Sequence, residues 1–368
     1  PRTEANFLLG TSQIRRTVIG NLKITPTYQS MKFKIIIFFL LIINFSFSQQ
    51  KNIINNESTT FQLISKDENI DFIVFDTKLE TKKPIFLWCQ GSLPYPLYVN
   101  SKEGIWLIGG GITNFDIENI TKNYYLVIVS MPKTPLVAEE SQINDSYWYF
   151  GHSKDKNIPT EEFQKADFLE NYTNRAIKVL KFLHKQKWVD NSRLIVAGHS
   201  QGSKVATKIA KNYKAVTKLG LFGANPFGRI DQNIRESRKD AENKKITWEK
   251  ANKEIEEEYE IYRNANNPQK VKANVNLIAW RSFSEPLIDD WLEINKPIYL
   301  AYGTYDIASD LCDLVPLYFI RNHKTNLTYK RYLNLEHNFF EVGEDGRANH
   351  DKPHWKEVMN NFVEWTLK

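Results

Sequence analysis

Apolar residues gather in eight short runs after residue 58, and these runs follow two different patterns. The first two, at 59–65 and 70–77, alternate apolar with polar residues and flank the polar segment 66–69. This alternation predicts an antiparallel hairpin with one exposed face. The other six runs are mostly continuous, as in central strands that are buried on both faces. They cover residues 84–89, 124–131, 193–197, 216–224, 297–302 and 327–335.

Helical patterns separate several of these runs. The clearest covers residues 160–187, where one stripe is apolar: Leu169, Tyr172, Ala176, Val179, Leu180 and Leu183. Strands that alternate with amphipathic helices are typical of an α/β fold. The sequence therefore predicts a mostly parallel, doubly wound sheet of eight strands.

A charged stretch at about 229–295 interrupts the alternation of strands and helices. Within it, residues recur at spacings of three and four, as on one face of a helix: Trp248, Ala251, Ile255, Tyr259 and Tyr262. We interpret this stretch as a helical cap insertion packed over the edge of the sheet. The alternative is a long solvated helix that joins two strands.

The N-terminal part has the pattern of a targeting signal. Met31 is the first methionine and precedes two lysines, the apolar run 35–43 and small residues at Ser46 and Ser48. This order predicts a secretory signal peptide at 31–48, cleaved before Gln49. The apolar stretch 33–47 is shorter than the roughly 20 residues of a membrane-spanning helix. We therefore expect a secreted or periplasmic protein without a stable membrane span, with residues 1–30 a non-native upstream segment and 49–368 the folded domain.

Composition and charge exclude several classes of protein. The chain is 42% hydrophobic and 13% aromatic, which is typical of a globular protein. Its net charge is +6, but residues 1–48 hold six basic residues and one acid, so the rest is close to neutral. No basic stripe supports a nucleic-acid partner. Cys89 and Cys312 are the only cysteines, and we expect two free thiols in place of a disulfide framework.

The segment Gly198-His199-Ser200-Gln201-Gly202 matches the pattern G-x-S-x-G. It follows the predicted strand 193–197 and precedes a helical pattern at 203–212, which is the context that a nucleophile elbow requires. Glycines on both sides let the strand and the helix approach each other while the serine hydroxyl points outward. Ser200 is therefore the candidate nucleophile.

A serine hydroxyl needs a base, and the base needs an acid that fixes its tautomer. The strand predicted at 297–302 is followed by Asp306, and the strand predicted at 327–335 is followed by His337. Both side chains thus come just after strand ends, and we take them as acid and base. Asp310 and Asp313 compete with Asp306 in the same loop.

Backbone N–H groups are expected to stabilise the oxyanion. One is that of Gln201, directly after the nucleophile, and the other is that of Ser92, which follows Gly91 after the strand 84–89. The glycines at 109–111 are the rival segment for the second donor.

Further residues after strand ends are candidates for substrate binding: Tyr95, Trp148, Phe150, Asn225 and Phe227. Three aromatic residues of the insertion either roof the pocket or pack in the core: Trp280, Phe283 and Trp291. His350 and His354 are four residues apart, but Pro353 disfavours a helical metal pair, so no metal is expected. The triad and the oxyanion hole complete a hydrolytic reaction, so no cofactor is expected either.

The order of these features resembles the α/β-hydrolase superfamily over residues 58–368. Ser200, Asp306 and His337 follow one another in the chain order which that superfamily uses. The elbow 198–202 and the loop Gly-Thr-Tyr-Asp at 303–306 are most similar to the dienelactone hydrolase and prolyl oligopeptidase-like branch. Gln90 stands where that branch often has histidine. The resemblance implies an α/β-hydrolase fold and a serine hydrolase.

Three functions remain open at this point. The first is a serine hydrolase that cleaves a carboxylic ester through an acyl-enzyme. The second is a serine peptidase acting on short peptides, for which the glutamates at 256–258 are a candidate amine anchor. The third is a catalytically silent hydrolase fold that binds a small molecule or a partner, and the presence of all three triad residues argues against it.

Overall fold

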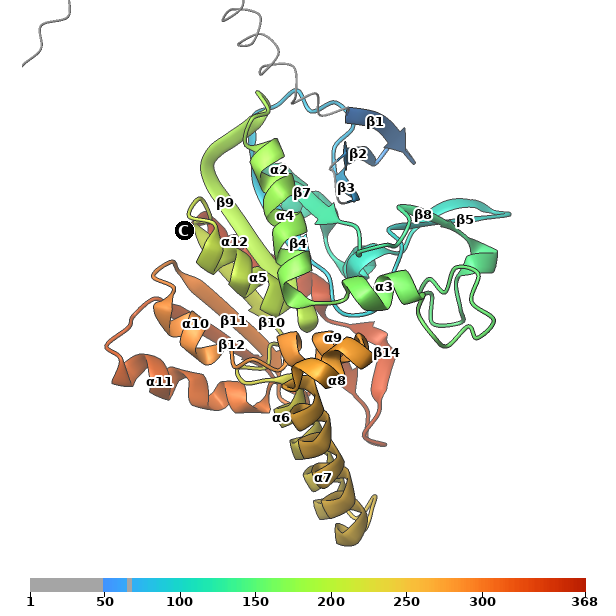
Figure 1. The fold of residues 1–368 in the computed structure, drawn as a ribbon. Coiled ribbons are helices and arrows are strands. Elements are labelled where there is room, and N and C mark those ends of the chain that lie inside the picture. Colours follow the sequence, from blue (N-terminus) through green and yellow to red (C-terminus); the bar gives the residue numbers. More distant parts are fainter. Residues whose placement is uncertain (1–48, 65–67) are drawn as a thin grey trace, which may run out of the picture. The chain divides into compact units, whose positions relative to one another are not determined.

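The structure is a computed structural model that describes residues 49–64 and 68–368. The predicted signal peptide at 31–48 and the upstream segment 1–30 lie outside the described residues. In the described part, nine strands form one sheet in the order β1-β2-β3-β7-β4-β9-β10-β11-β12 (Figure 1). Their bounds are β1 Gln49–Ile54, β2 Ser58–Ile64, β3 Asn69–Val74, β4 Lys83–Cys89, β7 Tyr125–Val129, β9 Val189–His199, β10 Lys218–Phe222, β11 Ile298–Gly303 and β12 Leu327–Tyr332.

The strand directions agree with the prediction of a mostly parallel sheet. Strands β7, β4, β9, β10, β11 and β12 run parallel to one another. Strands β1, β2 and β3 pair in antiparallel fashion, and β3 is also antiparallel to β7. The sheet has one strand more than the eight predicted, because β1 pairs with β2 from Gln49↔Leu63 to Ile54↔Ser58. Ile53 of β1 is 52% exposed, so backbone pairing holds this edge strand more than burial does. The hydrophobic pattern of the sequence therefore does not predict it.

Helices cover both faces of the sheet. The helices α4 (Leu169–Leu183), α5 (Gln201–Asn212), α10 (Ile288–Glu293) and α11 (Val315–Arg321) pack on one face. The helices α2 (Ile117–Asn123) and α12 (Trp355–Leu367) pack on the other. This two-sided cover is the doubly wound arrangement that the alternation of strands and helices predicts.

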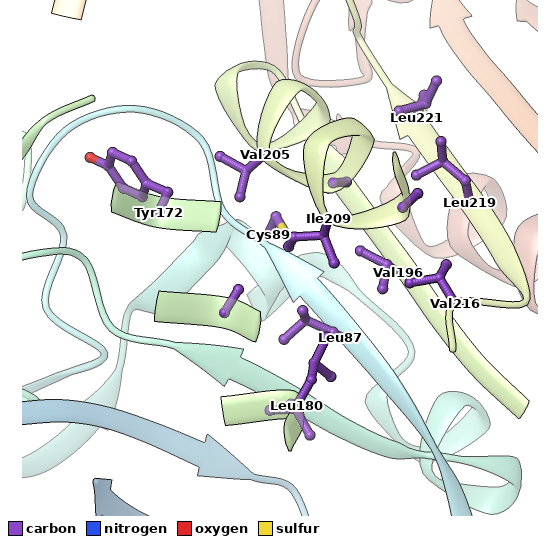
Figure 2. Packing of buried hydrophobic residues seen from close by; sticks show 14 of the residues in the cluster. Leu87, Cys89, Tyr172, Leu180, Val196, Val205, Ile209, Val216, Leu219 and Leu221 are labelled. Carbon is purple, nitrogen blue, oxygen red and sulfur yellow. The ribbon is translucent and has the colours of Figure 1, made fainter. Parts of the chain in front are cut away.

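Alternate side chains of each central strand enter the two cores. Figure 2 shows Leu87 and Cys89 of β4 beside Val205 and Ile209 of α5. The neighbouring Trp88 of β4 belongs to the opposite core, with α12. Burial of each such aliphatic side chain stabilises the fold by about 1.5–3 kcal/mol. The strands are therefore fixed from both sides, and so are the loops that leave their carboxyl ends.

Smaller elements surround this sheet. They are β5 (Tyr98–Ser101), β6 (Gly104–Leu107) and β8 (Val137–Glu139), which form a three-stranded sheet, the hairpin β13 (Phe340–Val342) and β14 (Ala348–Pro353), and the 3-10 helices Gly109–Asn114, Glu140–Gln142 and Asp310–Leu314.

The predicted helix at 160–187 is two helices, α3 (Glu161–Ala166) and α4. Phe168 between them is extended, with φ −149° and ψ 148°. The hydroxyl of Ser282 accepts a hydrogen bond of 3.1 Å from the N–H of Leu169, at the start of α4. A contact between segments 113 residues apart thus marks the break.

Residues 229–293 are helical and consist of α6 (Arg229–Glu242), α7 (Trp248–Ala265), α8 (Pro268–Ala273), α9 (Asn276–Phe283) and α10. Helices α6 and α7 lie side by side and extend away from the sheet (Figure 1). Helix α9 packs against α3, α4 and α7, while α10 packs on α5. Trp291 of α10 is fully buried and donates from Nε1 to the Thr207 hydroxyl at 2.9 Å. The last helix of the insertion is therefore part of the main core.

Candidate active site

Ser200 sits at the turn between β9 and α5 in a backbone conformation that is rare for any residue except glycine. Its φ is 55° and its ψ is −124°. Its N–H donates to the carbonyl of Phe222 at 2.9 Å, and its own carbonyl accepts from the Ser203 hydroxyl at 2.6 Å. Such a conformation costs about 1–3 kcal/mol and persists only where the surroundings enforce it. The two hydrogen bonds and the packed strand and helix enforce it here.

The two glycines of the elbow are required by close backbone approach. A Cβ on Gly202 would lie 2.1 Å from the carbonyl oxygen of Cys89, and a Cβ on Gly198 would lie 2.2 Å from the carbonyl oxygen of Gly202. Neither distance is possible for a real side chain, and both neighbours are backbone atoms that cannot swing away. The end of β4 is therefore in direct contact with the first turn of α5, next to Ser200.

Asp306 and His337 meet after the ends of β11 and β12. The distance from His337 Nδ1 to Asp306 Oδ1 is 3.0 Å, and Asp306 is 2% exposed. The N–H of Ala308 donates to Oδ1 at 2.9 Å, and the hydroxyl of Ser309 donates to Oδ2. The carboxylate is thus held on both oxygens, with one of them toward the imidazole.

The competing acids are engaged elsewhere. Asp310 forms an ion pair with Arg235 of α6. Asp313 accepts from the Tyr302 hydroxyl at 2.7 Å and from Arg331 Nε at 2.5 Å. Of the three acids in this loop, Asp306 is the one beside the histidine.

The surroundings of Asp306 and His337 shift the pKa values of both groups. Burial opposes ionisation of Asp306, but the imidazole of His337 and the donors from Ser309 and Ala308 outweigh it and lower the pKa of this carboxyl. Burial likewise opposes protonation of His337, but the Asp306 carboxylate outweighs it and raises the pKa of the imidazole. The pair therefore favours an ionised acid beside a histidine that is a stronger base than usual.

His199, inside the elbow, positions the backbone of His337. Its Nε2 lies 2.8 Å from the His337 carbonyl oxygen, and the centroids of the two rings are 4.7 Å apart. Burial, aided by the nearby His337, lowers the pKa of His199 to about 3. His199 is therefore neutral, and because a carbonyl only accepts, its Nε2 carries the proton.

Of the two residues expected to supply oxyanion donors, Gln201 directly follows Ser200 and Ser92 lines the same cavity. Gln201 is the first residue of α5, so its N–H is one of the unpaired donors at a helix start. Ser92 lines the same cavity as Ser200, and a Cβ on the preceding Gly91 would lie 3.9 Å from Ser200 Cβ. Of the rival glycines 109–111, Gly109 lies against Leu97 and Gly110 lies against Trp88 and Gln90, and none of the three is among the residues that line this cavity.

Ser200 and His337 open into a cavity of about 620 Å³. The main body contributes Ser92, Leu93, Ser200, Gln201, Lys204, Gly223, Asn225, Ala308 and His337 to its wall. The segment around α3 contributes Asn157, Ile158, Pro159, Phe163, Gln164 and Asp167. The helices α6 and α9 contribute Arg229, Gln232, Asn233, Asn276, Ala279 and Trp280. The strand ends and the helical insertion thus enclose one site.

Of the five residues expected to bind substrate, Asn225 lines the cavity. Its side chain also orders the turn into α6, since Nδ2 donates to the Gly228 carbonyl at 2.7 Å. Tyr95, Trp148, Phe150 and Phe227 are not among the lining residues. Trp148 and Phe150 are 8% and 5% exposed and pack inward, and Phe227 packs on the ring of Tyr318.

Of the three aromatic residues of the insertion, Trp280 lines the cavity, whereas Phe283 and Trp291 are fully buried. The sequence reasoning missed three charged lining residues: Asp167, Lys204 and Arg229. A signal existed for Lys204, because it lies four residues after the nucleophile, one helical turn on.

The described residues show no cluster of side chains suited to a metal ion. In that same part of the chain, no helix has the length and apolar character that crossing a membrane requires. Cys89 and Cys312 are both buried free thiols.

No protein-family model matches the sequence, and no curated protein is similar to it. Solved structures do resemble it. A putative dienelactone hydrolase from Klebsiella pneumoniae superposes with a TM-score of 0.51 at 11% identity, over 84% of this chain and 98% of that one. The acylaminoacyl peptidase of Pyrococcus horikoshii superposes with a TM-score of 0.50 at 12% identity, over 89% of this chain. The chain spans 43% of that peptidase. Together with the sheet order, these likenesses show that the chain has the α/β-hydrolase fold.

Proposed function

We propose that the protein is an exported serine hydrolase that cleaves a carboxylic ester with Ser200, His337 and Asp306. One observation carries this proposal: a serine in the elbow conformation, φ 55° and ψ −124°, lines the same cavity as a histidine whose Nδ1 is 3.0 Å from a buried carboxylate. A serine that only joined a strand to a helix would not need this strained conformation.

The reaction proceeds in two halves. Ser200 Oγ attacks the carbonyl carbon of the ester while His337 takes the hydroxyl proton, and the oxyanion accepts hydrogen bonds from the N–H groups of Gln201 and Ser92. The alcohol then leaves with the proton from His337, which leaves an acyl-enzyme. Water, deprotonated by His337, attacks the acyl carbon, and Ser200 recovers its proton as the acid departs. Asp306 orients the imidazole and stabilises its charged form.

The polar groups of the cavity favour an ester over a peptide with a free amine. The glutamates that the sequence suggested as an amine anchor are on α7, where Glu256 and Glu257 are exposed. Glu258 accepts from Asn233 Nδ2 at 3.0 Å, and none of the three is among the lining residues. Among those residues, the one carboxylate is that of Asp167, which accepts from the Tyr172 hydroxyl at 2.8 Å. Export is part of this proposal because the sequence pattern at 31–48 predicts a signal peptide.

The test uses residues 49–368 and a Ser200→Ala variant. Both are labelled with a fluorophosphonate probe and assayed on p-nitrophenyl esters and on aminoacyl p-nitroanilides. We expect labelling and ester hydrolysis in the wild type, and loss of both in the variant by a factor of about 10⁴ or more.

The rates on esters and anilides decide between the two hydrolytic functions, and ester hydrolysis should be the faster. A folded wild type that neither labels nor hydrolyses any substrate would refute the proposal and favour a binding protein.

A further inference from the structure

Lys204 is a buried lysine at the candidate active site whose amino group has no hydrogen-bond partner among the described residues. Its side chain projects from the first turn of α5, four residues after Ser200, and the residue is 7% exposed. Its Nζ is itself buried. Lys204 nevertheless belongs to the wall of the cavity that contains Ser200 and His337. Buried ammonium groups are costly unless they are paired, so this one needs an explanation.

The next lysines on the same helix show what a paired cation looks like. Lys208 lies 2.7 Å from Asp290 Oδ2, and Lys211 lies 2.5 Å from Asp290 Oδ1 and 2.7 Å from Glu293 Oε2. These two pack against α10, which supplies the carboxylates. Lys204, one turn nearer to Ser200, is close to the cavity instead.

The charged groups around Lys204 do not supply its missing partner. Asp231 pairs with Arg235 at 3.0 Å, and Glu285 lies 3.4 Å from Lys208. Burial, together with repulsion from Arg229 and Lys208, outweighs the attraction of Asp231 and Glu285 and lowers the pKa of Lys204 to about 7. An anion placed directly beside the Lys204 ammonium would raise its pKa again.

Arg229 adds a second, fixed positive group to the same cavity wall. Its guanidinium lies 5.4 Å from the ring centroid of Trp280 and 5.2 Å from that of Phe283. It also donates from Nη2 to Gln201 Oε1 at 2.7 Å. The carboxylate of Asp167 partly balances Arg229, although burial raises the pKa of that acid. With Lys204 protonated, the two cations of the wall outnumber its single carboxylate by one.

We propose that Lys204, with Arg229 beside it, binds a carboxylate on the substrate, so that the enzyme acts on esters whose acyl part ends in a negatively charged group. This inference rests on the proposed function. The ammonium would gain the acceptor and the counter-charge that the protein does not provide. One surplus cation matches the single charge of a carboxylate. Because Lys204 is about one helical turn, or about 5.4 Å, from Ser200 along α5, the carboxylate should be a few bonds from the scissile carbonyl.

The experiment compares two esters of nearly equal size. The mono-4-nitrophenyl ester of adipic acid carries a free carboxylate, and its methyl ester is neutral. Three proteins are assayed: the wild type, Lys204→Met, and Lys208→Met as the control. The control removes the same charge from the same helix outside the cavity wall, and it leaves Asp290 paired with Lys211.

We expect the wild type to prefer the charged ester by about tenfold or more in kcat/KM. In Lys204→Met the KM for the charged ester should rise by about 10- to 100-fold, which is the usual range for a lost hydrogen bond to a charged group. The neutral ester and the control should change by about threefold or less. Hydrolysis of the neutral ester without this preference, or a preference that survives Lys204→Met, would overturn the inference and leave the proposed function standing.

A binding measurement distinguishes a failure of the carboxylate subsite from a failure of the proposed hydrolase function. Calorimetric titration of the charged ester into Ser200→Ala, and into the same variant with Lys204→Met, reports the subsite without turnover. Binding that depends on Lys204 supports the inference even if the wild type neither labels with the fluorophosphonate probe nor hydrolyses any ester, an outcome that would refute the proposed function alone. Absence of binding in both proteins would overturn the subsite.

Discussion

The strand ends of the sheet and the helices of the insertion enclose the same cavity, but they are held in different ways. All six residues of β11, the strand that leads to Asp306, are buried. In α7, which supports the insertion, two residues of eighteen are buried, Ala251 and Ala265. Ser200, Asp306 and His337, the proposed triad, are therefore attached to the well-buried sheet, and the less buried insertion contributes polar and aromatic residues to the cavity wall. We infer that changes in the sheet region alter the rate of the chemical step, while changes in the insertion alter substrate binding.

The largest expected effect comes from the sheet side. Asp306→Asn removes the charge that stabilises the imidazolium and should lower kcat by a factor of about 10³–10⁴. The pH profile sharpens this prediction. In the wild type, Asp306 raises the pKa of His337, so kcat/KM should fall with decreasing pH at a midpoint above the usual value of about 6.5. Without Asp306, burial lowers the pKa, and the midpoint should move to lower pH. An unchanged midpoint would contradict the prediction that Asp306 raises the pKa of His337.

The second prediction concerns the stability of the elbow. Gly202→Ala would place a methyl group 2.1 Å from the Cys89 carbonyl oxygen, so the end of β4 and the start of α5 must separate. We expect the free energy of unfolding to fall by about 2–4 kcal/mol, measured by denaturant unfolding. Gly343→Ala is the matched control, because its methyl group would meet the movable side chain of Asp345 at 3.0 Å. Equal effects at both glycines would contradict the proposed tight contact.

A smaller effect is expected in the insertion. Trp280→Ala removes an aromatic wall of the cavity and the ring beneath Arg229. We expect KM to rise by about tenfold with kcat nearly unchanged, as for a lost aromatic contact. Trp248→Ala, at a 47% exposed position on α7, is the control and should change neither constant. A fall in kcat alone for Trp280→Ala would contradict the inference that the insertion affects substrate binding and the sheet region affects the chemical step.

The smallest effect is expected far along α7. Glu257 pairs with Lys253 at 3.7 Å, and both side chains are well exposed. Exposed pairs contribute little, so Glu257→Gln should leave kcat and KM within about twofold on esters and anilides alike. A selective loss on aminoacyl anilides would instead identify this glutamate as an amine anchor and favour the peptidase.

Strong hydrophobic patterns made the strands and the three triad candidates predictable from sequence. The apolar runs before Ser200 and Asp306 end within two residues of the ends of β9 and β11. The run 327–335 before His337 is broken by polar residues and was predicted too long, because β12 ends at Tyr332. The edge strand β1 and the break at Phe168 were not predictable in this way. No glycine or proline occurs in 161–187, and the break coincides with a hydrogen bond from the Leu169 N–H to the hydroxyl of Ser282 in a distant helix.

The cavity wall was harder to predict than the triad because it depends on how loops and the insertion fold back. Trp148 and Phe150 lie in a loop beyond β8, and both are buried and do not line the cavity. The position of Lys204 follows from helical spacing, but its lack of a partner depends on α10 reaching Lys208 and Lys211 only. Tertiary contacts of this kind leave no local pattern in the sequence.

The unusual φ of Ser200 has a consequence for the evolution and engineering of this chain. Glycine adopts φ 55° without steric conflict, so Ser200→Gly should relieve about 1 kcal/mol or more of strain, less the entropy that a glycine adds to the unfolded chain. Selection for stability alone would therefore favour glycine over serine at this position. A chain that keeps serine at position 200 is therefore less stable to heat than the same chain with glycine there. The rise in melting temperature of Ser200→Gly would measure this loss of stability.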